Sequence, residues 1–153
     1  MSRIKSFLRK NWMKAILAVV ALAALVVVIT LAFRPRPATG EGEVTFIVLE
    51  THKEGEATFI TWGIEKKVKF KKGDEAFELF KDQEEFDVDY SESELGVMIN
   101  GINGVFGEYT GEDHEDGYQI WTYWALYEDG EYSTKGIDGI KLTDGIVIEF
   151  RFE

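Results

Sequence analysis

Three aromatic residues, Trp121, Tyr123 and Tyr127, occupy alternating positions in the segment 118–132 (YQIWTYWALYEDGEY). If this segment is a long strand closed by an Asp-Gly turn, these side chains share one face, and the apolar residues between them occupy the other. A half-exposed sheet needs only one apolar face. The pattern therefore predicts one of two things: an aromatic surface that binds a small flat ligand or a protein partner, or a second face buried by the chain itself.

The residue types needed for nucleophilic catalysis are scarce. The chain has two histidines, His52 and His114, no cysteine and no G-x-S-x-G motif. Without a nucleophile beside a base, and with carboxylates too frequent for any pair to be diagnostic, the sequence indicates a protein that is not an enzyme and has no cofactor. The missing cysteines also exclude disulfides and thiolate zinc sites.

Residues 108–117 (EYTGEDHEDG) hold five acidic side chains and His114. Carboxylate oxygens are the ligands that calcium prefers, so a calcium site is one interpretation. The segment departs from the D-x-D-x-D-G pattern, and the domain around it is strongly acidic. We therefore favour a solvated loop and predict no metal site.

Charge divides the chain into two parts. Of 17 Lys and Arg, seven lie in residues 1–37, which contain no acidic residue; the remainder holds all 28 Asp and Glu and has a net charge of −18. An acidic domain repels phosphate backbones, so nucleic acid is not an expected partner.

Residues 15–33 form an almost unbroken apolar run, interrupted only by Thr30. As a helix this run would be about 28 Å long, close to the thickness of a bilayer core. A cleaved signal peptide is the alternative, but the run is long and is followed by Arg-Pro-Arg-Pro. We predict a basic cytoplasmic tail (1–14), a single-pass anchor in the lipid bilayer (15–33) and, because positive residues are concentrated before the run, an extracellular C-terminal domain.

After a Pro/Gly linker at residues 34–43, the folded domain is expected at 44–153. Residues 44–51 are β-prone with apolar side chains on both faces, which predicts a strand inside the sheet. Residues 64–70 and 146–153 alternate in the manner of strands, and Glu149 is expected on the solvent side of the last one. Gly73 and a capping Asp74 predict a short helix that ends near Asp82.

That helix has an apolar stripe of Ala76, Phe77 and Phe80. Asn-Gly pairs at 100–101 and 103–104 indicate turns or bulges. Together these features predict an α+β fold, with one short helix covering a mostly antiparallel sheet, preceded by the transmembrane helix.

Several short motifs occur in an order that resembles a known family. They are KKGDEAF (71–77), INGV (102–105), YWALY (123–127), GEY (130–132) and LTDG (142–145). Residues 44–153 resemble the transcobalamin-like C-terminal domain, a β-grasp-like module of bacterial and archaeal surface proteins and the smaller domain of animal cobalamin carriers. The resemblance implies a corrinoid-like ligand, and it adds Asn103 to the candidate contact residues. A structural or assembly module of the cell surface, without a small ligand, remains the alternative function.

Overall fold

The computed structural model describes residues 19–22, 35–54 and 57–153. Contacts divide the chain into two units, Met1–Arg34 and Pro35–Glu153. In the first unit only a helical turn at residues 19–22 is described, so the predicted tail 1–14 and most of the predicted anchor 15–33 lie outside the described residues. No helix within the described ranges is long and apolar enough to cross a membrane.

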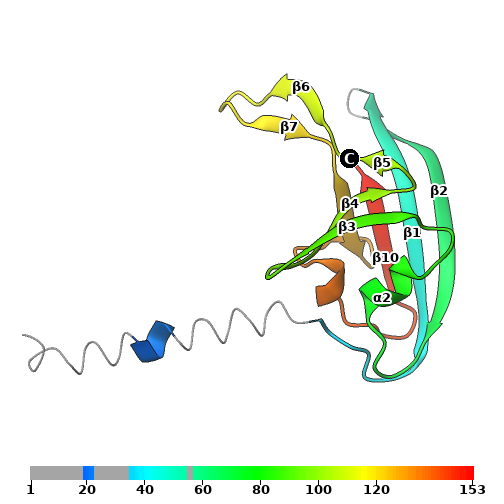
Figure 1. The fold of residues 1–153 in the computed structure, drawn as a ribbon. Coiled ribbons are helices and arrows are strands. Elements are labelled where there is room, and N and C mark those ends of the chain that lie inside the picture. The colour runs from blue at the N-terminus through cyan, green and yellow to red at the C-terminus, as the bar shows by residue number, and fades with distance from the viewer. Residues whose placement is uncertain (1–18, 23–34, 55–56) are drawn as a thin grey trace, which may run out of the picture. The chain divides into compact units, whose positions relative to one another are not determined.

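The second unit is built mainly of strands, with one short α-helix and one 3-10 helix (Figure 1). The elements in chain order are β1 (Gly42–Glu54), β2 (Ala57–Phe70), α2 (Ala76–Lys81), β3 (Val88–Ser93), β4 (Gly96–Ile102), β5 (Val105–Phe106), β6 (Tyr109–Asp113), β7 (Gln119–Trp121), β8 (Trp124–Glu128), β9 (Glu131–Tyr132), η1 (Ile137–Gly139) and β10 (Val147–Phe152).

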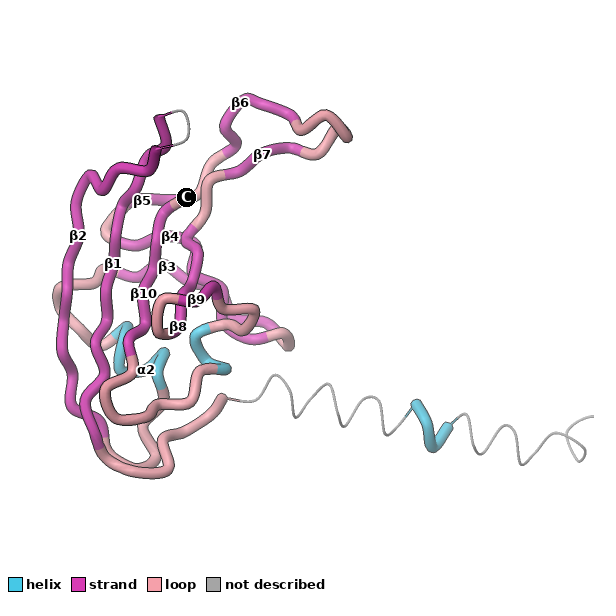
Figure 2. The backbone as a smooth tube through the Cα atoms, turned by 180° about the vertical axis from the view of Figure 1, so that it is seen from behind, coloured by secondary structure: helices cyan, strands magenta, loops and turns pink. Residues whose placement is uncertain are grey.

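The strands form three sheets. The main sheet has the order β2-β1-β10-β8-β9, in which only the β1–β10 pair is parallel. A second sheet, β3-β4-β5, lies over the same face of the main sheet as α2, and the β6–β7 hairpin projects from one end (Figures 1 and 2). The expected α+β plan with a mostly antiparallel sheet is confirmed.

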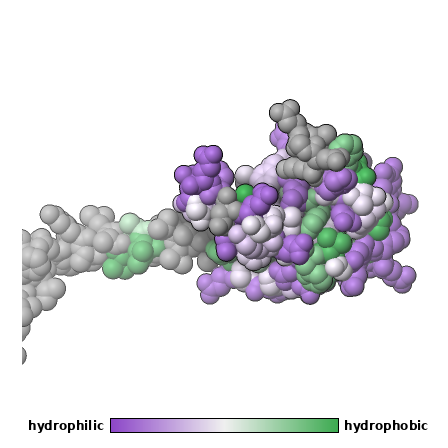
Figure 3. Space-filling view, turned by 90° about the horizontal axis from the view of Figure 1, so that it is seen from above, coloured by the Kyte–Doolittle hydropathy of each residue, from purple (hydrophilic) through white to green (hydrophobic). Residues whose placement is uncertain are grey.

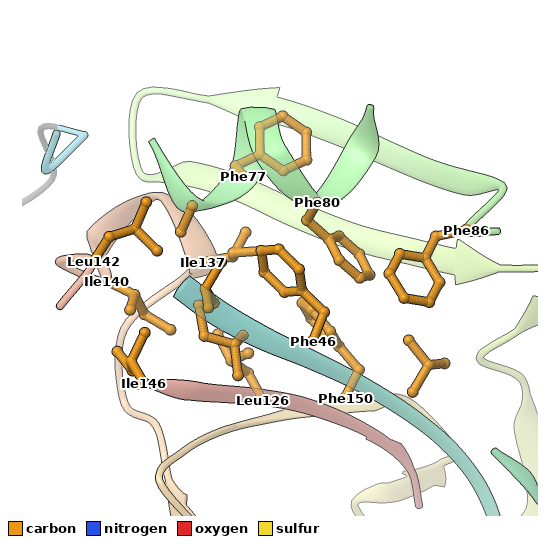
Figure 4. Close-up of a cluster of buried hydrophobic side chains, with 14 of the residues drawn as sticks. Phe46, Phe77, Phe80, Phe86, Leu126, Ile137, Ile140, Leu142, Ile146 and Phe150 are labelled. Carbon is orange, nitrogen blue, oxygen red and sulfur yellow. The ribbon is translucent and has the colours of Figure 1, made fainter. Parts of the chain in front are cut away.

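The core lies between the main sheet and α2. Val44, Phe46 and Val48 of β1 are fully buried, whereas Thr45, Ile47 and Leu49 on the other face are only partly buried. Phe80 of α2 packs onto both β1 and β10, with ring-centroid distances of 5.3 Å to Phe46 and 4.7 Å to Phe150 (Figure 4). Each buried phenylalanine stabilises the fold by about 2 to 3 kcal/mol relative to an exposed one.

The predicted apolar stripe of the helix and its end at Asp82 are confirmed. The predicted cap is wrong, because Glu75 occupies the N-cap position and makes no capping hydrogen bond. The Asp74 carboxylate instead accepts the backbone N–H of Lys71 at 2.9 Å and closes the preceding turn, in which Gly73 has a φ of +99°.

The expected single strand at 118–132 is also wrong, since the chain changes sheets at Thr122 and Tyr123. Thr122 donates its N–H to the Glu108 carbonyl at 2.9 Å, whereas Tyr123 exchanges two backbone hydrogen bonds with Glu153. Consecutive residues thus pair with different strands, which ends β7 and starts β8. A Cβ at Gly107 would lie 2.4 Å from the Thr122 carbonyl oxygen, so this close approach requires glycine.

Two further expectations differ from the structure. Within the predicted linker, Ala38 is buried; its N–H donates to the Asp74 carbonyl at 2.7 Å, and its carbonyl accepts the Gly73 N–H at 2.9 Å. The folded unit therefore begins before residue 44. Glu149, expected to face solvent, is only 8% exposed, because the Arg151 guanidinium binds both of its carboxylate oxygens at 2.7 and 2.9 Å.

Candidate functional site

A cleft of about 700 Å³ lies where the β6–β7 hairpin meets the adjoining ends of β1 and β10. Side chains from four strands and from the β7–β8 connection line it. They are Glu50, Thr51, His52, Thr110, Glu112, Ile120, Trp121, Thr122, Tyr123, Phe152 and Glu153. The parallel pairing of β1 with β10 and the change of sheet after Trp121 bring these segments together.

Trp121 and Tyr123 are the aromatic wall of this cleft. Trp121 is 53% exposed and lies opposite Tyr109 in the β6–β7 ladder, with the two ring centroids 5.8 Å apart. Tyr123 is 46% exposed and follows the end of β7. Burial of its lower part raises the pKa of the Tyr123 hydroxyl, and Tyr132 adds to that rise. Both sequence-predicted aromatics are therefore available to a ligand.

Tyr127 does not line the cleft but is held by the protein itself. Its ring lies under the Arg151 guanidinium, 3.9 Å from ring centroid to carbon, and edge-on to Tyr132 at 5.7 Å. Its hydroxyl donates to the Glu153 carboxylate at 2.9 Å, and this hydrogen bond raises the pKa of Tyr127. Tyr127 thus contacts the site only through Glu153.

Asn103 lies apart from the cleft, in the β4–β5 turn. Its φ of +51° and that of the following glycine, +78°, confirm the predicted turn. The Asn103 side chain accepts the Asp87 N–H at 2.8 Å and donates to the Glu85 carbonyl at 3.3 Å. These bonds give Asn103 a structural role.

His52, Ile120 and Phe152 also line the cleft, although their sequence neighbourhoods did not predict it. Phe152 has the alternation of a core residue, and its position at the end of β10 leaves it in the wall of the cleft. His52 stacks on Phe59 with ring centroids 5.4 Å apart. No local pattern identifies these residues, because their neighbours in the cleft come from distant parts of the chain.

The charged side chains of the cleft have one sign. Glu50, Glu112 and Glu153 line it, and no lysine or arginine is among its described lining residues. In the described part of the chain, no group of three or more His, Asp or Glu side chains converges as a metal site would require. Seen from above, the surface of the domain is mostly hydrophilic, with apolar residues exposed between charged ones (Figure 3).

The second unit is thus a small α+β domain with an aromatic, acidic cleft. Residues 67–153, more than half of the chain, match DUF4430, a domain of unknown function. The chain belongs to this family. The match supports, at a coarse level, the family resemblance of residues 44–153 that the sequence motifs indicated.

Several solved structures are similar to the chain. Haptocorrin in complex with Cbi is 19% identical with a TM-score of 0.49, and the match covers 75% of this chain but only 25% of haptocorrin. A protein from Ruminococcus gnavus ATCC 29149, described as a "putative metal binding protein", is 18% identical with a TM-score of 0.47, and the match covers 73% and 96% of the two chains. No curated protein matches the chain in sequence.

Proposed function

We propose that residues 35–153 form a binding module whose ligand occupies the cleft lined by Trp121 and Tyr123. The observation that carries this proposal is the exposure of these two large aromatic side chains around a cavity of about 700 Å³. Aromatic surface gathered in a concave site is typical of ligand recognition, because a bound ligand removes that surface from water.

The module is of the transcobalamin-like, β-grasp-like type. The topology supports this, since the first and last strands pair in parallel inside the sheet while one short helix crosses a single face. The resemblance of the sequence motifs makes a corrinoid the first small ligand to test, with a protein partner as the other occupant.

The apolar run at 15–33 would hold the module at the membrane, with the N-terminus in the cytoplasm and the domain outside. Protease added to intact cells should remove residues 35–153 and leave an N-terminal tag uncut. The opposite pattern of cleavage would contradict the orientation. We propose no catalytic role for the domain.

One observation favours a structural or assembly module instead. Tyr127, predicted to share a site with Trp121, is covered by Arg151 and Tyr132 of the same chain. If Trp121 were likewise needed for folding, the aromatic residues would serve the fold alone.

Equilibrium dialysis of the purified full chain against cobinamide and cobalamin, followed by corrin absorbance, tests the proposal. We expect binding in the micromolar range, its loss in Trp121→Ala with an unchanged thermal unfolding midpoint, and its retention in Tyr118→Ala. Tyr118 is a suitable control because it is exposed on the same hairpin and does not line the cleft. Unfolding of Trp121→Ala would support the structural alternative, and absence of corrinoid binding would leave a protein partner.

A further inference from the structure

The aromatic rings of the cleft differ from other aromatic rings of the domain in their access to positive charge. Arg151 lies over Tyr127 at 3.9 Å, and Lys81 lies over Phe77 at 5.1 Å and Tyr90 at 5.9 Å. Among the described residues, no lysine or arginine lies over Trp121 or Tyr123. No described lysine or arginine therefore competes with an external cation for these two rings, and the Tyr109 ring beside Trp121 adds a third aromatic group.

The charged side chains around Trp121 and Tyr123 also favour a positively charged ligand. Glu50 on β1, Glu112 on β6 and Glu153 after β10 all line the cleft. An anion would have to approach these carboxylates with no basic side chain among the described lining residues to balance them. A cation would gain from the field of the acids and from the rings together.

The arrangement suits an organic cation better than a metal ion. The carboxylates come from separate strands and, within the described residues, do not converge as a set of three ligands. A metal ion needs several oxygens within about 2.5 Å, whereas an ammonium group with an apolar body can use aromatic faces and more distant carboxylates. Phe152 and Ile120 would contact the apolar body.

We infer that the cleft selects an organic cation with an aromatic or apolar body. This inference rests on the proposed function, because it names the class of ligand for the same cleft.

Three probes of similar size and different charge test the inference by isothermal titration calorimetry on the full chain. They are benzyltrimethylammonium, benzyl alcohol and benzoate. We expect the cation to bind about tenfold more tightly than the alcohol, and benzoate more weakly than both. Raising the ionic strength should weaken binding of the cation and leave the alcohol unchanged.

Charge-removing variants identify the groups responsible. The double variant Glu112→Gln, Glu153→Gln should lower the affinity for benzyltrimethylammonium about tenfold and leave that for benzyl alcohol unchanged. Glu131→Gln is the matched control, because Glu131 is exposed and lies outside the cleft, and it should bind both probes as the unaltered chain does.

Equal affinities for the three probes, or an equal loss in the control, would overturn the inference. If benzyl alcohol binds as tightly as the cation and Trp121→Ala removes both, the cleft is a binding site without charge selection, so the proposed function stands and this inference fails. If none of the three probes and neither corrinoid binds, the result contradicts both this inference and the proposed function.

Discussion

Trp121 and Tyr127 are separated by five residues of one aromatic segment, yet their side chains have different surroundings. Tyr127 donates to Glu153 and lies under Arg151, whereas Trp121 is more than half exposed in the cleft wall. The difference arises because β7 and β8 belong to different sheets. At the scale of single residues, Trp121 and Tyr123 are therefore the candidates for binding. Tyr127 contacts the cleft only through its hydrogen bond to Glu153.

The stability of the domain in alkali should depend on Tyr127. The hydrogen bond to Glu153 raises the Tyr127 pKa above its ordinary value of 10.0, so the folded state holds this proton more tightly than the unfolded state. The resulting stability is complete below the unfolded pKa and is lost as the pH rises through the folded pKa. We expect Tyr127→Phe to lose less unfolding free energy than the unaltered chain between about pH 8 and about pH 11, as measured with urea.

Part of the alkaline loss should remain in this variant, because burial also raises the pKa of Tyr123. Identical pH profiles for Tyr127→Phe and the unaltered chain would show that the hydrogen bond has no such role.

Asn103 offers a second prediction at this scale. Replacing it with alanine removes two hydrogen bonds to the 85–87 backbone and places a Cβ-bearing residue without a polar side chain at a φ of +51°. We expect Asn103→Ala to destabilise the domain by about 2 kcal/mol, measured by urea unfolding. Asn103→Gly keeps the turn conformation and should lose only about half as much. Ligand binding in the cleft should be unchanged in both Asn103 variants. A loss of binding would show that Asn103 contributes to the site.

Among the elements, α2 is the one that most depends on packing. Six residues are too few for a stable isolated helix, and its N-terminus has no side-chain cap. The helix is stabilised by Phe80, whose ring contacts those of Phe46, Phe86 and Phe150 at centroid distances of 5.3, 4.8 and 4.7 Å. The helix is thus held by the sheet it covers.

Phe80→Ala should destabilise the domain by about 3 to 5 kcal/mol, because it leaves a cavity among three aromatic rings. The measurement is chemical unfolding followed by circular dichroism. Glu78→Ala on the exposed side of α2 removes only the ion pair with Lys81 and should cost less than about 1 kcal/mol. Similar losses in the two variants would mean that α2 contributes little through its buried face.

For the whole molecule, the boundary of the folded unit is the feature with a direct test. Backbone hydrogen bonds of Ala38, and one from the Glu43 N–H to the Asp144 carboxylate at 2.9 Å, attach residues 35–43 to the domain. A fragment of residues 35–153 should unfold cooperatively on its own, as expected for a unit with its own core.

A fragment of residues 44–153 should be less stable by about 3 to 5 kcal/mol, because it loses the five hydrogen bonds that Arg36, Ala38 and Glu43 make with residues 73–145 and the buried Ala38. Thermal and urea unfolding of the two fragments provide the comparison. Equal stabilities would show that residues 35–43 act only as a linker.

The sequence by itself determined the features that depend on neighbouring residues. Alternation places Ile148 and Phe150 of the last strand in the core, and the helical stripe identifies Phe77 and Phe80. Asp129-Gly130 is a turn because both residues adopt positive φ, 50° and 85°. Side-chain periodicity and backbone preference operate over a few residues, so the sequence alone can predict them.

Only the tertiary structure decided how the segment 118–132 is divided and which residues line the cleft. Thr45 pairs with Val147, and Tyr123 pairs with Glu153, so partners distant in the sequence set the environment of each side chain. Glu149 is buried, Tyr127 is covered and Trp121 is exposed as a result of these pairings. The alternation within each strand is the same whichever strand it meets, and for that reason the position of the cleft could not be predicted from the sequence.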